Sequence, residues 1–113
     1  MANIDHIAVQ VSNLKESVEW YLRSFNADLI YCDETWAMLE FGNTKLALTI
    51  PSQHPPHVAI QVSNISDFPC DAEEIREHRD GSKYLYVKDP SGNVIEYIYY
   101  PPEENPAGYI HLP

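Results

Sequence analysis

The sequence is poor in basic residues, in cysteine and in long apolar runs. Of its 113 residues 7 are Lys or Arg and 17 are Asp or Glu, which gives a formal net charge of −10. Phosphate-rich partners are bound mainly through cationic side chains, so we expect neither nucleic acid nor an anionic membrane as a partner. An acidic surface is compatible with a small cationic ligand.

Other absences narrow the class of protein further. No apolar run has membrane-spanning length, and the first residues enter a strand pattern without the basic and apolar regions of a signal peptide. Cys32 and Cys70 lack metal-motif spacing, which favours a reduced, cytoplasmic setting. The sequence contains no glycine-rich phosphate loop and no nucleophile elbow. A chain of this length predicts one domain, residues 1–113, with a single core.

What the chain does contain is an internal repeat. The stretch "DHIAVQVSN" at 5–13 returns as "PHVAIQVSN" at 56–64, with a histidine at the same place in both. A Gly-Asn turn follows in each half, at 42–43 and at 92–93. Self-similarity at a fixed spacing indicates two copies of one β-α-β-β-β unit.

Periodicity places the elements of each copy. The first copy predicts a strand at 4–11, an amphipathic helix from Ser12-Asn13 to near Asn26, and strands at 27–32, 35–41 and 44–50. The second copy predicts a strand at 57–62, a weaker helical stretch around 71–79, and strands at 82–88 and 93–100. The domain therefore divides into module one (1–50), a stiff linker (51–56), module two (57–100) and a tail (101–113).

This order of segments resembles the vicinal oxygen chelate superfamily, which includes glyoxalase I, extradiol dioxygenases and bleomycin resistance proteins. The resemblance spans residues 1–100 and rests on "IDHIAVQVSNL", "SVEWYLRSFNA", "FGNTKLAL", "PHVAIQV" and "DPSGNVIEYI". It implies an α+β fold in which two tandem β-α-β-β-β modules form a cupped mixed sheet. It also implies a divalent metal ion inside the cup, with Fe, Mn, Ni and Zn as candidates.

The family pattern places a histidine on the first strand of each module and a carboxylate on the last strand of each. His6, His57 and Glu96 match three of these four ligand positions. In the last strand, bulky side chains stand on both sides of Glu96 in the sequence and form one face, so Glu96 lies on the other face. In the last strand of the first copy, the residue at the equivalent position on that other face is Ala47. The resemblance therefore implies a site of two imidazoles and one carboxylate, which is typical of metals with open coordination positions. A duplicated strand would also carry both histidines along if they were purely structural.

The same alternation of faces predicts what lines the cup. Four large side chains would form an apolar, partly aromatic pocket, and two glutamines would add polar lining: Trp36, Met38, Tyr84, Tyr86, Gln10 and Gln61. Ordinary packing at a module or dimer interface explains these residues equally well. Glu40 is the candidate general base, against an exposed or interfacial carboxylate. His54 in the linker, His78 in a charged stretch interpreted as a solvated helix, and His111 in the tail carry less information.

Two classes of function follow. The first is a metal-dependent enzyme whose small substrate is chelated through two oxygens, such as a lyase, an isomerase or a ring-cleaving dioxygenase. The alternative is a metal-free protein that sequesters an antibiotic, as bleomycin resistance proteins do. Because a single module would leave its inner face and a sheet edge uncovered, we also expect a homodimer, with modules paired either within a chain or between chains.

Overall fold

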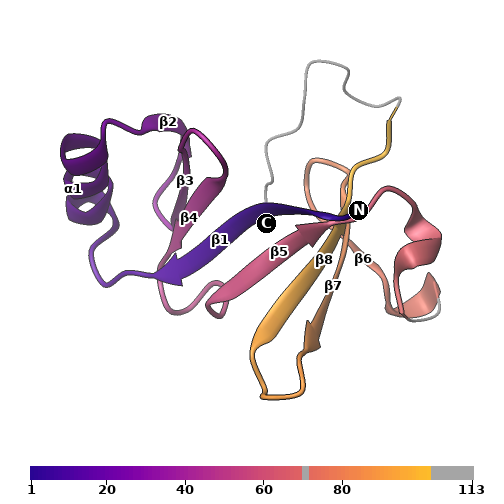
Figure 1. Cartoon of the computed structure of the whole chain (residues 1–113). Coiled ribbons are helices and arrows are strands. Elements are labelled where there is room, and N and C mark those ends of the chain that lie inside the picture. The colour runs from indigo at the N-terminus through magenta and orange to yellow at the C-terminus, as the bar shows by residue number, and fades with distance from the viewer. Residues whose placement is uncertain (70–71, 103–113) are drawn as a thin grey trace. The chain divides into compact units, whose positions relative to one another are not determined.

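The computed structural model describes residues 1–69 and 72–102. In chain order its elements are β1 (Asn3–Gln10), α1 (Leu14–Phe25), β2 (Asp28–Cys32), β3 (Trp36–Glu40), β4 (Lys45–Thr49), β5 (His57–Gln61), the short 3₁₀ helices η1 (Ile65–Asp67) and η2 (Ala72–Glu74), β6 (Arg76–Glu77), β7 (Lys83–Lys88) and β8 (Val94–Tyr99) (Figure 1). Cys70, His111 and most of the predicted tail lie outside the described residues. Within the described part, none of the helices is long and apolar enough to cross a bilayer.

The chain divides into two compact units, which we describe separately. His6–Val58 form the N-terminal unit, and Met1–Asp5 together with the chain from Ala59 onward form the C-terminal unit. The division cuts through β1 and β5, so the first two residues of β5 belong to the N-terminal unit.

The predicted helix of the first copy is confirmed, with caps at both ends. The Asn13 side chain accepts a hydrogen bond from the Glu16 backbone N–H at 3.0 Å, which satisfies one of the amides at the helix start. Asn26 ends the helix in the left-handed conformation (φ 54°), and its N–H donates to the Leu22 carbonyl. Leu14 and Val18 form the buried stripe of α1.

The sheet of the N-terminal unit has the strand order β2-β3-β4-β1, with β4 parallel to β1 and the other pairs antiparallel. One face packs on α1 through a core of Leu14, Val18, Ala37, Leu39 and Leu48. The opposite face carries three rows of cross-strand neighbours: His6, Lys45 and Glu40; Ala8, Ala47 and Met38; Gln10, Thr49 and Trp36. We call this opposite face the cup face. The alternation predicted from the sequence holds here, except that the bulky side chain of Ile7 is exposed.

In the C-terminal unit, the strand order is β5-β8-β7-β6, with β6–β7 and β7–β8 antiparallel. The backbone N–H of Val62 donates to the Ile98 carbonyl at 2.9 Å, and in the other unit Val11 donates to Thr49 at 2.8 Å. These bonds occupy equivalent places in the two copies. They make Ala47 the counterpart of Glu96, as predicted from the phase of the strands.

The helical stretch predicted around 71–79 is wrong. Within its described residues, 72–79, this part of the second copy contains only η2 and then β6, which pairs with β7 in a hairpin. The Asp80-Gly81 pair favours a tight turn, since Gly81 adopts φ +90°, and the turn takes the preceding residues into a strand. Phe68, at the end of η1, is buried and packs against Tyr97 at 5.7 Å between ring centroids.

Candidate metal centre

The two histidines of the repeat lie next to each other in the N-terminal unit. His6 on β1 is 1% exposed and His57 at the start of β5 is 7% exposed. Their rings meet edge to face, with centroids 5.5 Å apart and planes inclined at 75°. Buried imidazoles at this spacing are close enough to share a small ligand, because a metal–nitrogen bond is about 2 Å long.

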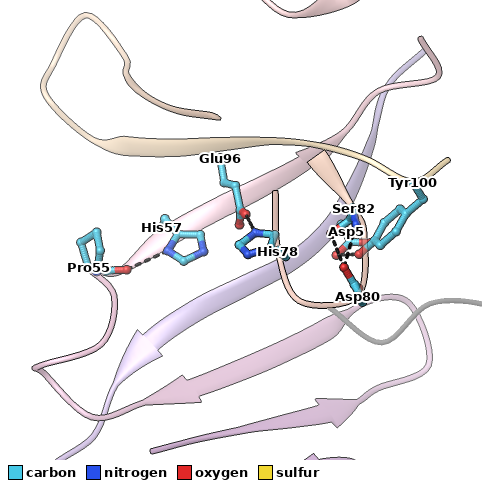
Figure 2. A network of polar contacts seen from close by, with 8 residues as sticks. All are labelled: Asp5, Pro55, His57, His78, Asp80, Ser82, Glu96 and Tyr100. Carbon is cyan, nitrogen blue, oxygen red and sulfur yellow. Dashed lines mark hydrogen bonds and ion pairs between the residues drawn. The ribbon is translucent and has the colours of Figure 1, made fainter. Parts of the chain in front are cut away.

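A hydrogen bond fixes the tautomer of His57. Its Nδ1 lies 2.7 Å from the carbonyl oxygen of Pro55, as Figure 2 shows. A carbonyl oxygen can only accept, so Nδ1 carries the hydrogen and Nε2 of the neutral ring carries the lone pair. Histidines that bind metals usually donate their second ring N–H to a carbonyl or carboxylate in this way. His57 is therefore held in the form that a metal ligand requires.

The linker that supplies this carbonyl is itself held in place. The Gln10 side chain donates through Nε2 to the His54 carbonyl at 3.0 Å, and the His54 ring lies 6.3 Å from that of His57. Gln10 is exposed, and its contact to the linker is additional to the polar lining role, which stays a prediction. His54 remains partly exposed among the prolines.

Glu96 is a fully buried carboxylate of the C-terminal unit. It lies on β8 opposite Tyr86 of β7, is 0% exposed, and accepts a hydrogen bond at Oε2 from Nε2 of His78 at 2.8 Å (Figure 2). The His78 ring, itself 4% exposed, stacks on Tyr84 with centroids 3.6 Å apart and planes at 10°. A carboxylate removed from water is stable only when its oxygens have such partners.

The interpretation of His78 as part of a solvated helix is therefore wrong. Its backbone N–H donates to the Ser82 carbonyl, and the Gly81 N–H donates back to the His78 carbonyl, so the residue opens a hairpin turn. The Asp80-Gly81 dipeptide between two strand-like runs was the sequence signal for this hairpin.

The tyrosines near Glu96 are weak acids. Burial, reinforced by the charge of Glu96 and by Tyr84, raises the pKa of Tyr86 well above its ordinary value. Burial also raises the pKa of Tyr100, together with the charge of Asp5, whose Oδ2 accepts a hydrogen bond from the Tyr100 hydroxyl at 3.0 Å. Both phenols therefore stay protonated at neutral pH and can donate hydrogen bonds.

The remaining predicted lining residues divide between the units. Trp36 and Met38 are buried on the cup face of the N-terminal unit, whereas Glu40 on the same strand is exposed. Tyr84 and Tyr86 are half-buried in the C-terminal unit and meet edge to face at 5.6 Å. Gln61, at the end of β5, is also half-buried.

Two buried polar atoms on the cup face were not anticipated from the sequence. Among the described residues, the indole nitrogen of Trp36 and the hydroxyl of Thr49 have no hydrogen-bond partner. The two residues face each other across β3 and β4, at a position where the strands exchange no backbone hydrogen bonds and side chains come closest.

Comparison with known proteins agrees with this architecture. A family model described as "Glyoxalase/Bleomycin resistance protein/Dioxygenase superfamily" matches residues 3–68, which include both histidine strands. The chain belongs to this superfamily. The resemblance inferred from the repeated strands and from the closing "DPSGNVIEYI" is thereby confirmed, as is the α+β fold class with its mixed sheet.

Individual members of the superfamily resemble the chain at lower identity. Metallothiol transferase FosB from Staphylococcus epidermidis is 27% identical, over 85% of this chain and 80% of the relative. The crystal structure of methylmalonyl-CoA epimerase from Mycobacterium tuberculosis superposes with a TM-score of 0.71 at 18% identity, covering 88% of this chain and 89% of that one. A superfamily member from Vibrio splendidus gives a TM-score of 0.66 at 13% identity, covering 88% and 100%. At these identities the solved structures establish the fold.

Proposed function

We propose that this protein is a metal-dependent enzyme of the superfamily, in which His6, His57 and Glu96 bind one divalent cation. Its substrate is a small molecule that reaches the metal through two oxygen atoms. The observation that carries the proposal is the tautomer of His57, whose Nδ1–H is committed to the Pro55 carbonyl.

The donor set suits a transition metal. Two neutral imidazoles match Fe, Mn, Ni and Zn, and one carboxylate reduces the net charge of the complex. Ala47 is the counterpart of Glu96 in the first copy and offers no donor atom. A three-ligand set leaves up to three positions of an octahedron for substrate and water.

A bound cation would act as a Lewis acid on the substrate oxygens. Around it, the chain supplies residues that bind and orient the substrate. The protonated hydroxyl of Tyr86, opposite Glu96 on β7, can donate a hydrogen bond to an anionic oxygen. Trp36 and Met38 provide an apolar surface for the rest of the molecule. Glu40, whose carboxylate is exposed on β3, is the candidate base.

We infer that thiol transfer is a further candidate reaction, in addition to the lyase, isomerase and dioxygenase reactions. The name of the relative from Staphylococcus epidermidis joins a metal to thiol transfer, and the alignment with it spans most of both chains. An electrophilic substrate with two neighbouring oxygens would suit both the metal and this chemistry.

Metal uptake tests the proposal directly. Protein purified without chelator and titrated with Mn²⁺, Fe²⁺, Ni²⁺ and Zn²⁺ in a calorimeter should bind one equivalent of at least one of them per chain. His57→Ala should abolish stoichiometric uptake while circular dichroism shows an intact fold. His54→Ala is the matched control, because it removes a neighbouring histidine that is not in the proposed set. Uptake by His57→Ala equal to that of the unmodified protein would refute the assignment.

A second measurement separates an enzyme from a sequestering protein. If the metal-loaded protein converts an electrophilic or chelating substrate and the chelated protein does not, catalysis is established. Tight binding of a cationic antibiotic, unchanged by chelator and by His57→Ala, would instead support sequestration.

A further inference from the structure

We propose that His78 is a positioning residue, which fixes the carboxylate of Glu96 so that the carboxylate binds a metal through one oxygen only. The inference rests on the proposed metal site and adds to it a residue outside the three ligands. It arises from the contacts within the C-terminal unit, all of which involve described residues.

The first observation is the contact between the two side chains. His78 Nε2 lies 2.8 Å from Oε2 of Glu96, and both side chains are almost entirely removed from water. An imidazole N–H at this distance engages Oε2 and fixes the rotation of the carboxylate. Oε1 is then the oxygen offered to a cation, which predicts a single Glu96–metal bond.

The second observation is that the chain builds His78 into a rigid hairpin. The side chain of Asp80 accepts hydrogen bonds at Oδ1 from the Ser82 backbone N–H at 2.8 Å and from the Ser82 hydroxyl at 2.6 Å. Gly81 supplies the positive φ of +90° that the turn requires. The turn thus fixes the backbone of His78 directly opposite Ser82.

The third observation is the stacking of the ring. Tyr84, two residues beyond Ser82 on β7, lies parallel to the His78 ring with centroids 3.6 Å apart. The stack fixes the plane of the imidazole, and the hydrogen bond to Glu96 fixes its direction. When such a hydrogen-bond partner of a metal-binding side chain is removed, the metal affinity of the site typically falls by about 10–100-fold.

The test uses the metal ion alone as the probe and the full-length protein. Calorimetric titration with Zn²⁺ or Mn²⁺ should give a dissociation constant about 10–100-fold higher for His78→Ala than for the unmodified protein. His78→Gln keeps an N–H donor and should recover part of this loss. His78→Phe keeps a ring on Tyr84 but has no donor, so it should lose as much as His78→Ala. Tyr84→Phe is the matched control, because it keeps the stack and removes only a hydroxyl.

A spectroscopic readout distinguishes positioning from general destabilisation. With Co²⁺ bound, the visible absorption bands report the number and geometry of the ligands. They should change in His78→Phe, whose carboxylate is free to rotate, and stay unchanged in Tyr84→Phe. Thermal unfolding without metal checks that each variant is folded.

Three results would overturn the proposal. If His78→Ala or His78→Phe is folded and binds the metal with the affinity of the unmodified protein, the positioning role of His78 is refuted and the metal site is not. Loss of binding as complete as in His57→Ala, without recovery in His78→Gln, would make His78 a ligand. Absence of uptake by the unmodified protein would overturn the metal site and this inference together.

Discussion

Replacing Thr49 by Val should stabilise the protein. The Thr49 side chain is 2% exposed, and among the described residues its hydroxyl has no hydrogen-bond partner. Burying an unpaired hydroxyl costs about 1–3 kcal/mol, and the native fold carries that cost. Valine keeps the branched shape that suits a strand and replaces the hydroxyl with a methyl group.

The expected gain is about 1–2 kcal/mol in the free energy of unfolding. The substitution removes only the cost of the hydroxyl, because the neighbouring indole N–H of Trp36 stays unpaired. For a chain of this size such a gain raises the melting temperature by about 4–8 °C. Urea unfolding of the metal-free protein at pH 7, with an unchanged m-value, is the appropriate assay.

Thr49→Ser is the control, since it keeps the hydroxyl and removes the methyl group. It should lower the free energy of unfolding by about 1 kcal/mol. If Thr49→Val were instead less stable than the unmodified protein, the hydroxyl must have a partner, such as an ordered water bridging to Trp36. The statement that the Thr49 hydroxyl is buried without a hydrogen-bond partner would then be refuted.

Three further predictions concern other parts of the chain. Burial raises the pKa of Asp33, but hydrogen bonds from Thr35, Tyr31 and Trp36 outweigh it and hold the pKa below its ordinary value. Asp33→Asn should therefore lower the free energy of unfolding by about 1 kcal/mol at pH 7. This difference from the unmodified protein should shrink as the pH falls through the depressed pKa, because the wild-type carboxylate then becomes protonated. Gly92→Ala should lower the free energy of unfolding, measured in urea, by about 1–2 kcal/mol. Gly92 has φ +88° in a turn whose backbone amides are capped by the Asp89 carboxylate. An unchanged free energy would mean that the turn adopts another conformation. If the protein is a homodimer whose modules pair between chains, a mixture of His6→Ala and Glu96→Ala should regain part of the metal binding that each variant lacks, whereas a monomer in light scattering at micromolar concentration would exclude any shared site.

Strong local patterns made the first copy predictable from sequence. Asn13 and Asn26 bracket α1 because an N-cap acceptor and a residue tolerant of the left-handed conformation are local requirements, independent of tertiary contacts. The alternation of small and bulky residues fixed the faces of β4, because a slip of one residue would move Leu48 from the core to the cup face. The correspondence of Ala47 with Glu96 followed from the same alternation.

The second copy was harder because its signals were charged and short. The run before His78 has the composition of an exposed helix, and composition alone does not register that its end pairs with β7. The contact between His78 and Glu96 joins residues 18 positions apart through a hairpin, and nothing in the spacing of the two indicates it. The exposure of Ile7 likewise depends on which neighbours cover β1, which local sequence does not encode.

The contact between Pro55 and His57 gives the linker a chemical role. A proline-rich connector is usually judged by its length and stiffness, as a spacer between two structured parts. Here one of its carbonyl groups decides which nitrogen of an imidazole bears the proton. A change in the linker that redirected this carbonyl would leave every proposed ligand in the sequence and still offer the metal the wrong tautomer. The permitted variation of the linker is therefore limited by acid–base chemistry as well as by reach.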